Sequence, residues 1–169
     1  HFKGKQEVLD AVISLIERRL MENVALVEKQ EPDPIQRLNL LLKLHVRFIR
    51  QNQGVFRIVF SDDLHGDEPS RRRRIYGMIR RYLQRVEKII REGQEQNMIR
   101  PDLDPAVAST MFLGLIQPAA ILWHMSGGDF DITRQTERAW LIFAEAIQTS
   151  GETPYALTKD INNEEGGMT

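Results

Sequence analysis

The chain of 169 residues contains no cysteine. This absence excludes disulfide bonds, zinc sites built on thiolates and cysteine nucleophiles. The N-terminal region also lacks the apolar segment and small-residue cleavage site of a signal peptide. The net charge of −1 excludes the overall positive field that is typical of a protein binding nucleic acid by itself. We therefore expect a cytoplasmic protein without a strong attraction of its own to DNA.

The sequence also lacks the alternation of apolar and polar residues that is typical of β-strands. Apolar residues recur instead at steps of three and four along most of the chain, which predicts helices. We expect an all-α fold of six helices in one domain, residues 1–149, followed by a poorly ordered polar tail, residues 150–169. The expected helices span residues 5–29, 34–51, 55–60, 70–96, 105–125 and 132–149. Asp33-Pro34 and Asp104-Pro105 predict two of the helix starts, with aspartate as N-cap and proline in the first turn.

Motifs of known catalytic sites are missing as well. The sequence has no Gly-x-Ser-x-Gly, no phosphate-binding glycine loop, no His-Glu-x-x-His and no Glu-x-x-His. Its four histidines, His1, His45, His65 and His124, fall on different expected elements. The acidic segment 62–68 could offer oxygen ligands to a hard cation, but it lacks the EF-hand spacing and is typical of a turn. We predict no enzymatic activity, no cofactor and no metal site.

Between residues 105 and 123 no side chain is charged, and about 18 such residues suffice to suspect a membrane span. Ser109, Thr110 and Gln117 within this stretch, and acidic residues on both sides of it, favour a soluble helix. Such a helix has no charged face for solvent, so it is either the central helix of a monomer or is covered by a second chain. We favour a homodimer in which the last two helices of each chain form a four-helix bundle. The predicted interface residues are Leu115, Pro118, Ala119, Leu122, Trp140, Phe143, Ala144 and Ile147.

Aromatic and polar side chains at helical spacing indicate a ligand pocket with mostly apolar walls. Pro118 favours a kink that could open space beside Gln117. The alternative for each side chain is an ordinary place in the core. The predicted ligand-binding residues are His45, Phe48, Phe56, Phe60, Tyr82, Gln117 and Trp123.

Four consecutive arginines, Arg71–Arg74, begin the helix expected at 70–96, where their charge opposes the helix dipole. One interpretation is an anionic partner such as DNA, an acidic surface or a ligand carboxylate. The other is a solvated face balanced by the acidic residues of segment 62–68. We favour the solvated face, because charge runs on helices usually face solvent.

The opening residues read His1-Phe2-x-Gly4-Lys5-x-x-Val8-Leu9. This pattern resembles the junction in TetR-family transcription regulators between the DNA-recognition helix and the helix that leads into the ligand-binding body. The loop that begins Gly93-x-x-x-Asn97-Met98-Ile99 resembles the family's connection between its long central helix and the penultimate helix. The last two helices, joined by a glycine-rich turn, resemble the family's dimerisation element.

The resemblance implies that this chain is the effector-binding and dimerisation part of a ligand-responsive regulator, expected to be a repressor. Residues 1–5 would then be the end of a helix-turn-helix domain and its linker, with His1 and Lys5 near DNA phosphates. The implied partners are a second copy of the chain, a small and mostly apolar effector, and operator DNA bound through the N-terminal domain. A helical carrier protein with no DNA role is the main alternative, and a helical enzyme is a weaker one.

Overall fold

Six α-helices make up nearly all of the described chain, residues 4–55 and 69–149 of a computed structural model. They are α1 (Lys5–Gln30), α2 (Pro34–Gln51), α5 (Pro69–Glu95), α6 (Pro105–Gly114), α7 (Gln117–Met125) and α8 (Ile132–Ile147). No β-strand occurs within these ranges, so the all-α expectation is confirmed. The helix expected at 55–60 lies outside the described residues except for Val55, and so does the tail 150–169.

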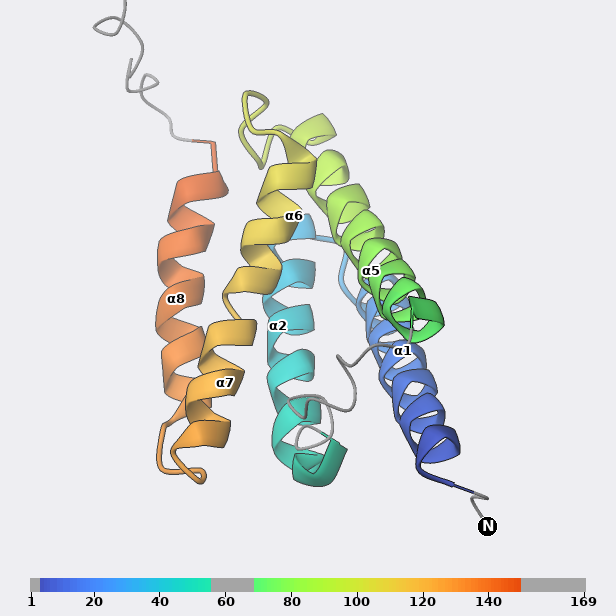
Figure 1. Cartoon of the computed structure of the whole chain (residues 1–169). Helices are drawn as coiled ribbons and strands as arrows, with labels where there is room; N and C mark the ends of the chain where they lie inside the picture. The colour runs from blue at the N-terminus through green and yellow to red at the C-terminus, as the bar shows by residue number, and fades with distance from the viewer. Residues whose placement is uncertain (1–3, 56–68, 150–169) are drawn as a thin grey trace, which may run out of the picture.

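Helix α2 lies in the middle of the bundle (Figure 1). It contacts α1 and α5 on one side and α8 on the other, while α6 packs on α5 and α7 packs on α8. Large apolar side chains from every helix except α7, and from the turn before α7, are almost completely buried between the helices. Among them are Ile13, Leu38, Leu41, Leu42, Ile49, Tyr82, Ile89, Ile90, Phe112, Ile116 and Ile132.

The two predicted Asp-Pro helix starts are present. The side chain of Asp33 accepts hydrogen bonds from the backbone N–H groups of the second and third residues of α2, at 2.8 and 3.1 Å. Asp104 does the same at the start of α6, at 2.8 and 3.4 Å. These bonds satisfy amides that have no acceptor within the helix, so both aspartates stabilise the helices they begin.

The single helix expected over residues 105–125 is wrong, because the structure divides this stretch into α6 and α7. A turn at Leu115 and Ile116 separates them. Pro118 is the second residue of α7, where its missing N–H costs no intrahelical hydrogen bond. By length and composition Pro105–Met125 could cross a membrane. The break and the burial of Phe112 and Ile116 within the bundle favour the core of a helical domain instead.

A tight turn ends α5. Asn97 has a φ of 58°, and the carbonyl oxygen of Gly93 accepts hydrogen bonds from the amides of Met98 (2.9 Å) and Ile99 (3.0 Å). A left-handed residue after the last helical turn lets the chain reverse over the helix end. The fully buried Ile99 then packs so closely on Gly93 that a Cβ there would lie 2.5 Å from Ile99 Cδ1. A larger residue at this position would therefore force Ile99 to shift.

The chain following this turn is joined to the end of α8. The amide of Arg100 donates to the carbonyl of Ile147 (2.9 Å), and the amide of Thr149 donates to the carbonyl of Met98 (3.2 Å). The Thr149 hydroxyl also bonds the Asn97 carbonyl at 2.6 Å. The end of α8 is thus fixed to the end of α5.

Candidate functional site

His45 of α2 and Tyr82 of α5 form a buried polar pair. They are 8% and 1% exposed, and His45 Nδ1 lies 3.3 Å from the Tyr82 hydroxyl. The two rings meet edge to face, with centroids 5.7 Å apart. Burial lowers the pKa of His45 from 6.5 to about 4 and raises the pKa of Tyr82. Both groups are therefore neutral at pH 7 and share one hydrogen bond between α2 and α5.

Of the other predicted ligand-binding residues, Phe48, Gln117 and Trp123 lie within the described part of the chain. Phe48 is buried on α2, whereas Gln117 is exposed at the start of α7. Trp123 is buried on α7, where it lines an open groove. Phe56 and Phe60 lie outside the described residues. Among the predicted residues that are described, His45 and Tyr82 contact each other.

The groove, which we call the α2–α8 groove, has a volume of about 720 Å³ and lies between α2, α8 and the turn that joins α7 to α8. Its outer wall is cationic, with Lys43, Arg47 and Arg50 exposed on one face of α2. Its buried lining residues are Leu42, Val46, Trp123 and Thr136. Reading the sequence missed this groove, because cations at positions 43, 47 and 50 are also typical of an ordinary solvated helix face.

Polar contacts join α1 to α5 along much of their length. At one end, Arg71 contacts Gln6 and lies 4.0 Å from Asp10. Arg74 lies 3.5 Å from the same carboxylate and donates a 2.6 Å hydrogen bond to Ser14 Oγ. Arg71 is only 7% exposed, so the expectation of a solvated arginine run is wrong for this residue. An arginine in this position needs acceptors from the helix it packs on.

The same pairing continues toward the other end of α1. Arg81 contacts Glu17, and Arg85 lies 2.5 Å from Glu28. We refer to all these interactions, from Arg71 to Arg85, as the α1–α5 polar contacts. The acidic segment 62–68, which was expected to balance the arginines, lies outside the described residues.

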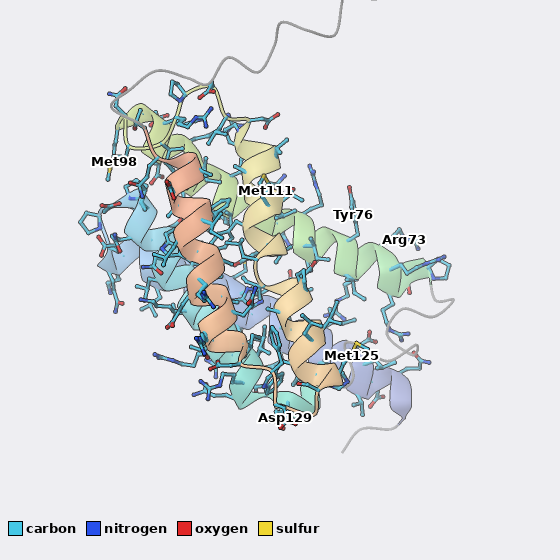
Figure 2. The ribbon with its side chains drawn as sticks, turned by 90° about the vertical axis from the view of Figure 1, so that its left-hand side faces the viewer. Arg73, Tyr76, Met98, Met111, Met125 and Asp129 are labelled. Atoms are coloured by element: carbon cyan, nitrogen blue, oxygen red, sulfur yellow. The ribbon has the colours of Figure 1, made fainter. Side chains whose placement is uncertain are left out.

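Helices α6, α7 and α8, of which α7 contacts both of the others, expose large apolar side chains. Figure 2 shows Met111 and Met125 projecting from α6 and α7, with α8 beside them. Leu141 and Ile142 of α8 are 67% and 73% exposed. We call this surface the α6–α8 apolar face. Its exposed apolar residues are Val107, Met111, Ile121, Leu122, Met125, Leu141 and Ile142.

Most of the predicted interface residues lie elsewhere on these helices. Ala119, Trp140, Phe143, Ala144 and Ile147 are buried in the core of their own chain, and Leu115 is half-buried. Only Pro118 and Leu122 are exposed among the eight. The sequence shows that these helices are apolar on more than one side. It does not show which side packs on the chain itself.

The residues predicted to lie near DNA phosphates are at the start of the chain. His1 lies outside the described residues, and Lys5 is the first residue of α1. Within residues 4–55 and 69–149, no group of three or more acidic or histidine side chains is placed to hold a metal ion.

The sequence matches the family described as tetracyclin repressor-like, C-terminal domain, over residues 31–147. SlmA of Shewanella sediminis, a nucleoid occlusion factor, is 26% identical over 155 residues, which cover 89% of this chain and 76% of that protein. The similarity to SlmA spans 155 residues and therefore extends beyond residues 31–147, which match the family.

Solved structures share the fold, among them the following two. One is a Clostridium perfringens protein assigned as a regulator of fatty acid metabolism, with a TM-score of 0.72, 23% identity, and coverage of 89% of this chain and 80% of that chain. The other is the transcriptional regulator FadR of Bacillus subtilis in complex with stearoyl-CoA, with a TM-score of 0.67, 22% identity, and coverage of 87% and 78%. Because the family match covers more than half of the sequence and the helices have the matching arrangement, this chain belongs to the TetR family as a tetracycline repressor-like C-terminal domain.

Proposed function

We propose that this chain is the effector-binding and dimerisation part of a cytoplasmic, ligand-responsive transcriptional repressor. In this proposal the DNA is bound by a helix-turn-helix domain joined to the N-terminal end of α1. The observation that carries the proposal is the α6–α8 apolar face, because exposed apolar side chains such as Met111, Leu141 and Ile142 are costly to leave in water. The family and the named relatives do not favour an enzyme.

Two copies joined through the α6–α8 apolar face would bury these side chains around a two-fold axis. The test is sedimentation velocity on the intact protein at micromolar concentration. Leu141→Glu is expected to shift the protein from dimer to monomer, because it places a charge in the interface. Tyr76→Glu changes a side chain of similar exposure on α5, outside the apolar face, and is expected to remain dimeric. A monomeric wild type would overturn the dimer.

The effector is proposed to bind between α2 and α5, next to His45 and Tyr82. This pair is neutral and offers one polar contact within otherwise apolar surroundings, which suits a small and mostly apolar molecule. The FadR relative was solved with stearoyl-CoA, so fatty acyl thioesters are the first compounds to try, with the acyl chain as the apolar part that would lie at this site.

The α1–α5 polar contacts provide a route from such a site to DNA. A shift of α5 relative to α2 would move α1 with it, because Arg71, Arg81 and Arg85 bind side chains of α1. The N-terminal end of α1 lies at the edge of the molecule (Figure 1), where a DNA-binding domain would be attached. Moving α1 in both subunits would change the distance between the two DNA-binding domains, which must match half-sites about one DNA turn apart. The effector acts through its different affinities for the two states.

The deciding experiment is selection of DNA duplexes from a random pool by the intact protein encoded by the whole gene. Enrichment of a palindromic site, and a change in affinity for that site when stearoyl-CoA is added, are the expected results. A carrier protein with no DNA role would enrich no sequence, and that result would overturn the regulator. Mass spectrometry of small molecules that co-purify with the protein would identify an effector other than a thioester.

A further inference from the structure

We propose that the α2–α8 groove is a binding site for an amphiphilic anion, a molecule that joins a phosphate or carboxylate group to a flat apolar body. This site is separate from the proposed effector position, because His45 pairs with α5 whereas the groove lies on the side of α2 that packs on α8. It does not depend on the proposed regulatory function.

The first argument is the charge of the groove. Among its described lining residues, Lys43, Arg47 and Arg50 are cationic and only Glu137 is acidic, in a protein whose net charge is −1. The three cations are spaced four and three residues apart, which places them on one face of α2. A concave wall with one sign of charge concentrates ions of the opposite sign.

The second argument is that these cations are available. Within the described part of the chain, Lys43, Arg47 and Arg50 take part in no ion pair. Elsewhere in the same structure, arginines such as Arg37 and Arg85 each contact a glutamate. Arg50 donates a 3.2 Å hydrogen bond to the hydroxyl of Thr133 on α8, which holds its guanidinium across the groove. An anion entering here would therefore gain charge-assisted hydrogen bonds without first breaking an ion pair between described residues.

The third argument is the apolar surface beneath the cations. The largely buried side chains of Leu42, Val46 and Trp123 line the groove, so the parts of them that face it are apolar, and one of them is an aromatic ring. The volume of about 720 Å³ lies within the range of sites for small organic molecules. A simple inorganic anion would use the cations but would make no contact with these apolar side chains. The combination suits a ligand that has both parts.

The test uses 1-naphthyl phosphate as the probe and the intact protein labelled with ¹⁵N. The indole N–H signal of Trp123 is identified by its loss in a Trp123→Phe variant. We expect this signal to move saturably on addition of the probe, while the indole signal of Trp140, which is buried against Phe143, stays in place. Inorganic phosphate and 1-naphthol, which each carry one half of the probe, are expected to bind at least about tenfold more weakly.

The charge requirement is tested with a Lys43→Gln/Arg47→Gln double variant. Both side chains are exposed, so the substitutions are expected to leave thermal stability unchanged, and they are expected to raise the Kd of 1-naphthyl phosphate about tenfold or more. Arg18→Gln/Arg19→Gln removes the same charge from an exposed part of α1 and is expected to change the Kd less than about twofold.

Three results would overturn the site. The first is a Trp123 signal that does not move when the probe is added. The second is an equal rise in the Kd of 1-naphthyl phosphate in the two double variants. The third is binding of inorganic phosphate or 1-naphthol as tight as that of the probe. Equally tight binding of 1-naphthol would show that the cations take no part. Equally tight binding of inorganic phosphate would show that the apolar surface takes no part.

Discussion

Acidification is expected to destabilise the fold through one residue, His45. Its side chain is 8% exposed, and burial lowers its pKa to about 4 in the folded protein, against 6.5 for an exposed histidine. Between these values the unfolded chain binds a proton at this position and the folded chain does not. The stabilisation is therefore complete above pH 6.5 and is lost as the pH falls toward 4.

The magnitude follows from the two pKa values. At about 1.4 kcal/mol per pH unit, the difference between 6.5 and about 4 corresponds to about 3 kcal/mol in full, and to about 2 kcal/mol at pH 5. A loss of about 2 kcal/mol is a large part of the stability of an ordinary domain. The assay is urea unfolding followed by circular dichroism at pH 8, 7, 6 and 5, with protein and salt concentrations held constant.

Two variants test whether the titration of His45 causes the loss of stability at low pH. His45→Gln removes the titrating ring and is expected to abolish most of the loss between pH 8 and pH 5. Tyr82→Phe removes the hydroxyl but keeps His45 buried, so the pH dependence is expected to persist while overall stability falls by about 1 kcal/mol. A wild type that loses less than about 0.5 kcal/mol from pH 8 to pH 5, or a His45→Gln variant with the wild-type dependence, would refute the reasoning.

Three further predictions concern the packing and the polar contacts of the fold, and each is tested by urea unfolding at pH 7.5. Gly93→Ala is expected to destabilise the fold by about 1–3 kcal/mol, because its Cβ would overlap the buried Ile99. Gly77→Ala is the control and is expected to stabilise the fold by about 0.5 kcal/mol, because only the flexible end of Arg81 is near. Equal effects of the two substitutions would contradict the close approach of Ile99 to Gly93. Asp104→Ala is expected to cost about 1 kcal/mol through the lost N-cap, and an unchanged midpoint would argue against it. A double-mutant cycle on Glu17 and Arg81 is expected to give about 0.2–1 kcal/mol, since both side chains are partly exposed; no coupling would remove this pair from the α1–α5 polar contacts.

Local signals in the sequence predicted most of the fold. The starts at Asp33 and Asp104 were correct, because an aspartate before a proline acts on the next few amides and needs no distant partner. The break at Leu115 and Ile116 was missed, since the apolar pattern of residues 105–125 continues across it. Pro118 was the available signal, and it marks a helix start here rather than a kink.

The surfaces were harder to predict, because they depend on tertiary packing. The pairing of Arg81 with Glu17 joins residues 64 positions apart, and nothing near either residue indicates it. The apolar pattern of α8 placed Trp140 at a dimer interface, whereas Leu141 next to it is the exposed residue. A one-residue difference of this kind cannot be resolved by periodicity alone, because both residues are apolar.

The attachment of α8 to the loop after α5 limits how a dimer could rearrange. Four hydrogen bonds connect residues 146–149 to residues 97–100. At its other end, α8 begins at the Asp131 cap, directly after the turn from α7. Sliding of α8 along its own axis would break the four hydrogen bonds to residues 97–100. A change in the angle between two subunits packed through α8 would therefore be a rotation of whole subunits, with each α8 keeping its register within its own chain.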